Sequence, residues 1–145
     1  MIHKKRYSKN WRSKIVIFVT LGGTALFLFL GYREPKVTIS PANFNVQAPW
    51  GITLPMVEIA SVDTIVWNDM PPIALRTNGF SLFGVNRGSF RTRDGNNVRL
   101  NLKCGANPVI RISDKNGRIY YVNRRKPEET KDIFITLTNY LKYTN

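Results

Sequence analysis

The sequence predicts a mainly β domain of about seven strands that ends in one α-helix and follows a single N-terminal transmembrane helix. Three observations predict this order. Residues 15–32 are apolar and carry no charge. Between residues 37 and 122, short β-prone runs alternate with glycine, proline and asparagine, which is typical of strands joined by turns. Residues 127–143 carry apolar side chains at three- and four-residue steps, the period of an amphipathic helix.

Composition limits the chemistry that the chain can perform. The 145 residues carry 22 Lys and Arg against 9 Asp and Glu, a net charge of +13, and are long enough for one domain with a tail. The only cysteine is Cys104 and the only histidine is His3. A disulfide framework, a CxxC site, a catalytic triad and most metal clusters all need more of these residues. We therefore expect no cofactor, no metal and no enzymatic activity.

The apolar run fits a membrane anchor. Eighteen helical residues span roughly 27 Å, close to the hydrocarbon thickness of a bilayer. Tyr7, Trp11 and Tyr32 lie near its ends, where interfacial aromatic residues are common. A buried helix of a soluble protein is seldom apolar on every face, and a cleaved signal peptide would end in small residues rather than in bulky ones. An uncleaved helix over 15–32 is favoured over both alternatives.

The charges that flank this helix predict its orientation. Only Arg33 and Lys36 follow it closely, whereas the tail before it, residues 1–14, carries six basic residues: Lys4, Lys5, Arg6, Lys9, Arg12 and Lys14. The positive-inside rule then predicts a single-pass protein of the cytoplasmic membrane, with the tail in the cytoplasm and residues 33–145 outside it. Such a tail is a topology signal, and no nucleic-acid partner is expected.

After a linker at 33–36, residues 37–143 form the predicted domain. Its early strands cover 37–40, 44–46, 50–54 and 62–67, followed by a glycine-bearing segment at 76–90 and by four strands at 88–93, 98–103, 109–113 and 118–122. Pro127 suits the first position of the final helix. Because that helix has one apolar face, we expect Phe134 and Leu137 to be buried against the sheet.

Alternation of apolar residues predicts how the last four strands pair. A three-residue loop at 94–96 sets Phe90 opposite Leu100, and a two-residue turn at 116–117 sets Ile112 opposite Tyr121. Joining the two hairpins directly sets Leu102 opposite Ile110.

This register gathers arginine side chains on one face of the sheet. Arg91 lies opposite Arg99, with Arg111 diagonal to Arg99, and Arg76 lies on the preceding segment. The face is either a solvated surface or a site for an anion or an acidic partner. The candidate binding residues are Arg76, Arg91, Arg99 and Arg111, although Arg76 can instead pair with Glu58 or Asp69.

Several segments resemble the bacterial pleckstrin-homology-like (PH-like) domains over about residues 37–143. The similar stretches are Trp50–Val62 (WGITLPMVEIASV), Pro71–Phe80 (PPIALRTNGF, with its RTNG), Gly88–Arg91 (GSFR) and Pro108–Ile112 (PVIRI). The resemblance implies a small barrel or sandwich with a C-terminal helix, in a membrane context. The basic clamp for phosphoinositides in eukaryotic relatives has no counterpart at 37–54, so the resemblance implies no lipid recognition.

Two functions remain open. The first is a non-catalytic, membrane-anchored module that binds a protein of the bacterial cell envelope through its apolar strands and the segment 68–88. The alternative is docking to anionic lipid or glycolipid headgroups through the arginine-rich sheet face, which high salt would weaken.

Overall fold

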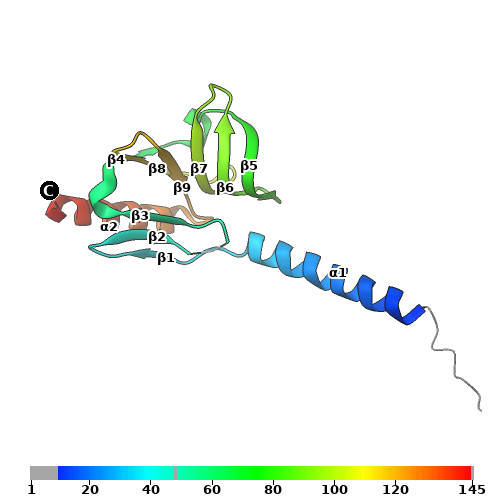
Figure 1. Ribbon diagram of the computed structural model, residues 1–145. Coiled ribbons are helices and arrows are strands. Elements are labelled where there is room, and N and C mark those ends of the chain that lie inside the picture. Colours follow the sequence, from blue (N-terminus) through cyan, green and yellow to red (C-terminus); the bar gives the residue numbers. More distant parts are fainter. Residues whose placement is uncertain (1–9, 48, 145) are drawn as a thin grey trace, which may run out of the picture.

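The computed structural model describes residues 10–47 and 49–144 (Figure 1). An N-terminal helix, α1 (Asn10–Tyr32), leads into two β-sheets, and a second helix, α2 (Pro127–Thr144), ends the chain. The first sheet holds β1 (Val37–Ile39), β2 (Asn43–Val46) and β3 (Ile52–Pro55). The second holds β4 (Ile59–Ile65), β5 (Ile73–Leu82), β6 (Val85–Thr92), β7 (Asn97–Lys103), β8 (Val109–Asp114) and β9 (Ile119–Val122). Short 3-10 helices, η1 (Met56–Glu58) and η2 (Trp67–Asp69), flank β4.

This architecture confirms the mainly β domain with a C-terminal helix. The described residues form nine strands rather than about seven, in part because the segment 76–90 folds into a hairpin, β5–β6.

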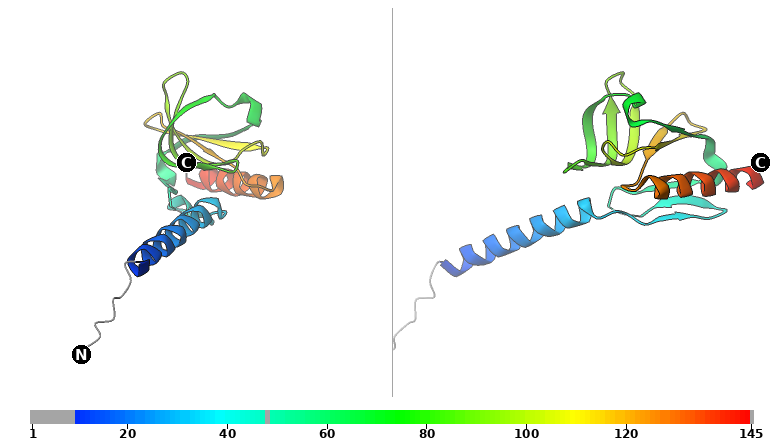
Figure 2. Two further views of the ribbon diagram at one scale, coloured as in Figure 1. Left: turned by 90° about the vertical axis from the view of Figure 1, so that its right-hand side faces the viewer. Right: turned by 180° about the vertical axis from the view of Figure 1, so that it is seen from behind.

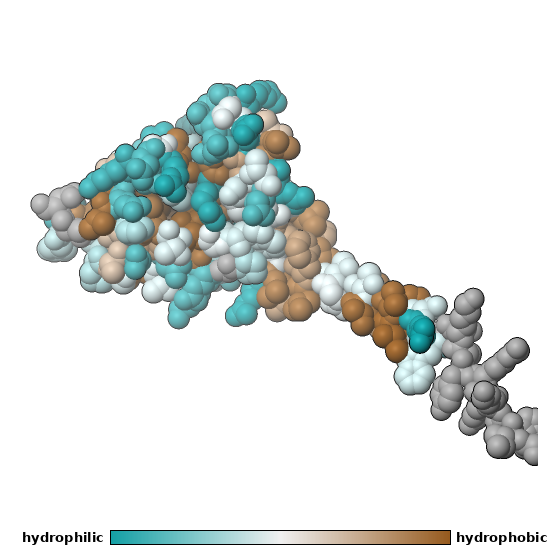
Figure 3. Space-filling model, in the orientation of Figure 1, coloured by the Kyte–Doolittle hydropathy of each residue, from teal (hydrophilic) through white to brown (hydrophobic). Residues whose placement is uncertain are grey.

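Helix α1 projects away from the domain (Figures 1 and 2). Its residues Trp11–Tyr32 are long and apolar enough to cross a membrane, and nearly all of their side chains are exposed. Figure 3 shows apolar side chains along this helix and at the place where it meets the domain. Of the basic residues expected to set the orientation, Arg12 and Lys14 lie at the start of α1. Lys4, Lys5, Arg6 and Lys9 lie outside the described residues.

The six-stranded sheet has the order β4-β8-β9-β7-β6-β5, and the parallel pair β7–β9 lies at its centre. The direct pairing of β7 with β8 that the sequence predicted is therefore wrong, because β9 lies between them. Tyr120, Tyr121 and Val122 are consecutive in β9 and all buried. Both faces of β9 are covered by packed side chains, Tyr120 and Val122 in one core and Tyr121 in the other, as is typical of the parallel, central part of a sheet.

Both predicted hairpin registers differ from the observed ones. Phe90 pairs with Val98, so the first loop has three residues as expected but lies one residue earlier, at 93–95. Ile112 pairs with Tyr120, and the second loop has three residues, 115–117, instead of two. The carboxylate of Asp114 causes the longer loop, because Oδ1 accepts hydrogen bonds from two backbone amides of the loop region, each at 2.9 Å.

The six-stranded sheet has a core on each face. One face packs against the small sheet and α2, and its core includes Phe44, Leu54, Ile112 and Leu137. Leu137 is fully buried there as expected, whereas Phe134 is only half-buried. The opposite core includes Leu100 and Tyr121, with Trp67 and Met70 of the β4–β5 connection packed against it. Figure 2 shows α2 lying alongside the small sheet, below the six-stranded one.

Candidate functional site

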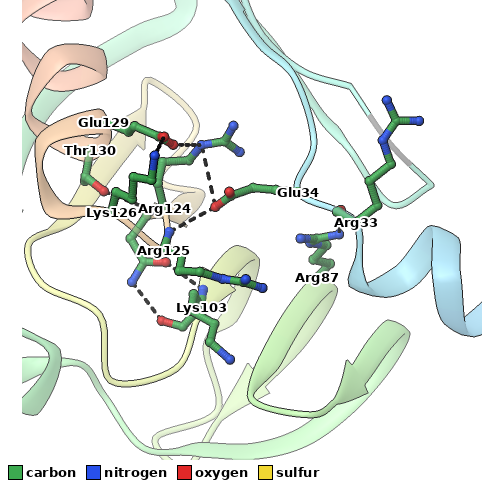
Figure 4. A network of polar contacts seen from close by, with 10 residues as sticks. Arg33, Glu34, Arg87, Lys103, Arg124, Arg125, Lys126, Glu129 and Thr130 are labelled. Carbon is green, nitrogen blue, oxygen red and sulfur yellow. Dashed lines mark hydrogen bonds and ion pairs between the residues drawn. The ribbon is translucent and has the colours of Figure 1, made fainter.

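The last turn of α1 is bonded to the domain by a buried arginine. Arg87, on β6, has only 4% of its surface exposed. Its Nη1 donates a hydrogen bond to the carbonyl oxygen of Gly31 at 2.7 Å. It donates another to the carbonyl oxygen of Arg33, and Figure 4 shows Arg33 beside Arg87. The last carbonyl groups of an α-helix lack partners within the helix. Arg87 therefore caps the end of α1 from a position 54 to 56 residues further along the chain.

Burial sets the electrostatics of this contact. Desolvation lowers the pKa of Arg87 to about 10, while the nearby carboxylate of Glu34 raises it and the cations of Arg124 and Arg125 lower it further. At neutral pH the guanidinium group remains charged, because its pKa still lies well above 7. A buried charge of this kind needs hydrogen-bond acceptors, and two helix-end carbonyl groups at the negative end of the helix dipole supply them.

Glu34 connects the linker after α1 to the start of α2. Its Oε1 accepts a hydrogen bond from the backbone amide of Arg125 at 2.9 Å and lies 4.0 Å from Nε of Arg124. Arg124 also lies 3.7 Å from Glu129, and its backbone amide donates to the hydroxyl of Thr130 at 2.9 Å (Figure 4). These contacts join the linker after α1 to residues 124–130, about 90 residues further along the chain.

An aromatic cluster packs beside the polar contacts. The rings of Phe27, Trp50 and Phe80 lie 5.5 to 5.9 Å apart, centroid to centroid, and come from α1, the β2–β3 connection and β5. Gly31 allows this packing, because a Cβ at residue 31 would lie 2.2 Å from the ring of Phe80. The helix and the domain thus share both a polar and an apolar contact. We call these contacts the junction: Gly31, Glu34, Phe80, Arg87 and Arg124.

Two glycines allow the strands of the β5–β6 hairpin to approach each other closely beside the junction. Gly79 and Gly88 pair across the hairpin and both have positive φ, 143° and 115°. A Cβ on Gly79 would lie 2.0 Å from the carbonyl oxygen of Arg87, and a Cβ on Gly88 would lie 2.3 Å from that of Asn78. The close approach of the two strands next to Arg87 therefore depends on glycine at both positions.

A groove of about 310 Å³ opens beside the junction. Three cationic side chains, Arg33, Lys36 and Arg124, line it together with Glu34. Because Glu34 already pairs with Arg124, the groove has an excess of positive charge and attracts anions.

Strand β5 forms a free edge of the six-stranded sheet. It pairs only with β6 among the described strands, and its residues 74–78 are all exposed. Leu75, in this stretch, has 55% of its surface exposed. An unpaired strand edge presents backbone N–H and C=O groups that can pair with another chain. The other edge, β4, is contacted by α2.

The four arginines expected to form one face do not lie together. Arg91 pairs with Asn97, and Arg99 pairs with Ser89, so Arg91 and Arg99 are diagonal rather than opposite. Arg99 and Arg111 lie on opposite faces of the sheet, because Arg99 shares a face with Tyr120 and Arg111 shares one with Tyr121. The insertion of β9 between β7 and β8 causes this separation.

Two of these arginines are bonded closely within the domain, and Arg91 has a longer contact, 3.4 Å from its Nε to the amide oxygen of Asn97. Arg111 binds Asp63 with two hydrogen bonds of 3.0 and 2.6 Å, and these bonds raise the pKa of Arg111. Arg99 donates from Nη2 to the carbonyl oxygen of Gly51 at 2.7 Å. Arg76 lies on the exposed part of β5, and neither Glu58 nor Asp69 forms an ion pair with it in the described part of the chain.

The described residues hold no cluster of three or more His, Cys, Asp or Glu that could bind a metal ion. The thiol of Cys104 is half-buried and accepts a hydrogen bond from the amide of Asn86 at 3.4 Å. Burial raises its pKa, which makes the thiolate less available at neutral pH.

Sequence reasoning missed Arg87, Glu34 and Arg124. On β6 the pattern shows only that Arg87 shares a face with Ser89 and Arg91, and nothing near it in sequence indicates its partners. One local signal was present: glycines spaced along 79–88 indicate a close approach of backbone.

No family model, curated protein or solved structure matches this chain.

Proposed function

We propose that this chain is a non-catalytic protein-interaction module of the bacterial cell envelope, anchored by α1 as a single-pass membrane helix. The junction supports the anchored part of the proposal. A domain on a flexible tether needs no contacts with its membrane helix, whereas here Arg87 caps the helix end and Gly31 packs against Phe80. These contacts hold the domain at a fixed angle to the helix, and hence to the membrane.

A kinship with PH-like domains belongs to the same proposal. The order of strands followed by one C-terminal helix supports it. The parallel pairing of β7 with β9 departs from the consecutive hairpins that the sequence predicted.

The orientation is also part of the proposal. The six basic residues within residues 1–14 support an N-terminus in the cytoplasm and a domain outside it. A membrane-impermeant thiol reagent tests this on a full-length Cys104→Ser variant that carries Asn116→Cys in the exposed β8–β9 loop. Spheroplasts should label as strongly as lysed cells, and protection in intact spheroplasts would reverse the assignment.

The free edge of β5 carries the proposal of protein interaction. Its residues 74–78 are exposed, and no second strand from the described residues lies beside them, so an extended segment of a partner can extend the sheet there. Two register irregularities bend β5, one between Ile73 and Leu75 and one between Arg76 and Asn78. Such bends disfavour non-specific pairing of β5 with the sheet edges of other proteins. A partner strand must follow the bent path of β5 in order to pair with it.

Charge indicates the chemistry of the partner. Arg76 lies on the free stretch of β5, and Arg91 and Arg93 follow on the neighbouring strand and its loop; all three are exposed. Leu75 shares a face with Arg91, and Arg76 points to the opposite face. An extended segment that alternates apolar and acidic side chains fits this edge, because its apolar residue can cover Leu75 while its acidic residues lie on the side of Arg76. The arginine face predicted for lipid headgroups is not assembled, so the protein partner is the function that the geometry supports.

Site-specific photocrosslinking in living cells tests the proposal. A benzoylphenylalanine in place of Ala74 should crosslink to one segment of one envelope protein, and the same probe in place of Asn116 should not. Arg76→Glu should reduce the crosslink at position 74, whereas Lys115→Glu, the same charge change on an exposed loop, should leave it unchanged. Identical products at positions 74 and 116, or none at 74, would contradict the assignment of β5.

A further inference from the structure

The tip of the β5–β6 hairpin carries a phenylalanine, Phe83, at a turn position that such a residue seldom occupies. Leu82 pairs with Val85, so Phe83 and Gly84 form a two-residue turn. Both have positive φ, 51° and 70°, the combination of a type I′ turn. The first of these positions favours Asn, Asp or Gly, because a bulky side chain is strained there.

Nothing in the core of the domain explains the phenylalanine. Phe83 has 67% of its surface exposed and Leu82 has 44%. Phe83 is thus strained in its backbone and exposed to solvent in its side chain. Both features are unfavourable for the free energy of folding, and no packing in the core of the domain offsets them. A residue held in an unfavourable conformation at an exposed tip points to a role outside the fold.

The position of the tip relative to α1 indicates what that role is. The ring of Phe83 contacts the ring of Tyr32 edge-on, with the centroids 6.3 Å apart. Tyr32 is the last residue of α1 and ends the apolar stretch that can cross a membrane. An aromatic residue at that place lies at the lipid–water interface, and Phe83 beside it lies at the same depth.

Cationic side chains surround the two rings. The guanidinium group of Arg125 lies over the ring of Tyr32, 5.3 Å from its centroid. Nζ of Lys103 donates to the carbonyl oxygen of Phe83 at 3.1 Å and thereby supports the turn. Apolar rings next to basic groups match the interfacial layer of a bilayer, where acyl chains meet lipid phosphates.

We propose that Leu82 and Phe83 insert into the interfacial layer of the same membrane that α1 crosses. The inference rests on the proposed membrane anchor and deepens it. The domain then has two attachments to the bilayer, the helix and the hairpin tip. The same hairpin carries Arg87, which caps the helix, so β6 links the two attachments and prevents the domain from tilting.

Fluorescence quenching in reconstituted vesicles tests the proposal. The full-length Cys104→Ser protein is reconstituted into vesicles of phosphatidylcholine and phosphatidylglycerol, with or without brominated acyl chains. An environment-sensitive fluorophore is attached in turn to Phe83→Cys, to Val19→Cys within α1 and to Asn116→Cys in the exposed β8–β9 loop. We expect strong quenching at positions 19 and 83 and none at 116.

The outcomes distinguish the insertion from the anchor. If the probe at position 19 is quenched and the probes at positions 83 and 116 are not, the proposed insertion is wrong and the membrane anchor is supported. Absence of quenching at position 19 would overturn both.

An apolar fluorophore can itself enter a membrane, so a second variant controls for the probe. With the probe on Leu82→Cys, adding Phe83→Asn should cut the quenching by half or more, because asparagine suits the turn but not the bilayer. Unchanged quenching would show that the probe, and not Phe83, enters the membrane, and would overturn the proposal.

Discussion

Gly31, in the last turn of α1, packs directly against the ring of Phe80 on β5. A Cβ at residue 31 would lie 2.2 Å from two carbons of that ring, a distance that atoms not bonded to each other cannot adopt. Phe80 is fully buried and also contacts Phe27 and Trp50. The end of α1 is therefore part of the packed interior of the domain.

Gly31→Ala should loosen this contact. The added methyl group must displace the ring of Phe80, and overpacking of this kind costs about 1–3 kcal/mol. Thermal unfolding of the full-length protein in detergent micelles measures the cost as a lower midpoint. Gly23→Ala is the matched control, because no atom lies within 4 Å of a Cβ at that position. Equal midpoints for the two variants would show that the helix end does not pack on Phe80.

Gly88→Ala should destabilise the β5–β6 hairpin more than Gly95→Ala does. Both glycines have positive φ, 115° and 90°, so alanine is strained at either position by about 1 kcal/mol or more. Only at residue 88 does the new Cβ also meet backbone, 2.3 Å from the carbonyl oxygen of Asn78, whereas nothing lies within 4 Å at residue 95. The free energies of unfolding in denaturant decide this, and a larger loss in Gly95→Ala would contradict the close approach.

Asp114 should make the domain sensitive to acid. Burial raises the pKa of its carboxyl group, but hydrogen bonds from the Arg118 amide, the Tyr120 hydroxyl and the Asn116 amide outweigh this and lower the pKa overall. A lowered pKa in the folded state means that the group stabilises the fold at neutral pH. This contribution is lost as the pH falls below about 4, through the ordinary carboxyl range and then through the folded pKa.

Asp114→Asn measures that contribution. At pH 7 the variant should lose about 2 kcal/mol of stability, because hydrogen bonds to a buried carboxylate become weaker. At pH 3 the gap between the variant and the wild type should narrow. A gap that widens on acidification would show that the pKa of Asp114 is raised rather than lowered in the folded protein.

Arg99 and Arg91 should differ in their effect on stability. Arg99 is half-buried and bonds the carbonyl oxygen of Gly51, so Arg99→Gln should cost about 1–3 kcal/mol. Arg91 is exposed, and its contact with the amide oxygen of Asn97 is long, at 3.4 Å, so Arg91→Gln should change stability by less than about 0.5 kcal/mol. Chemical denaturation of both variants decides this. A more stable Arg99→Gln variant would contradict this prediction, because it would show that Arg99 and Arg91 repel each other in the folded protein.

Local patterns were sufficient to predict most of the elements. The apolar run predicted α1, Pro127 and the apolar face predicted α2, and proline and glycine marked the breaks between the strands. The burial of Leu137 could be predicted because Leu137 lies on the apolar face of α2, which packs inward whichever sheet it contacts. Such features depend on neighbours a few residues away, which the sequence displays.

Pairings between distant segments could not be predicted in the same way. Strand β9 pairs with β7 as well as with β8, and the alternation of apolar residues along each strand does not show which distant strand lies beside it. The longer β8–β9 loop depends on the side chain of Asp114, which accepts hydrogen bonds from two backbone amides, whereas the alternation of apolar residues predicted a two-residue turn. Arg87 was missed because its acceptors lie at and just after the end of α1, more than 50 residues earlier in the chain.

We propose that the junction fixes the domain rigidly to α1, and a distance measurement tests this most directly. Spin labels on Val19→Cys and Asn116→Cys, in a full-length Cys104→Ser protein held in lipid nanodiscs, report the distance from helix to domain. A pair on Asp94→Cys and Asn116→Cys serves as a control within the domain. We expect a narrow helix-to-domain distribution in the wild-type junction, and a broad one with Arg87→Met while the control pair stays narrow. A broad distribution with Arg87 intact would contradict the account, because the domain would then swing freely on its anchor.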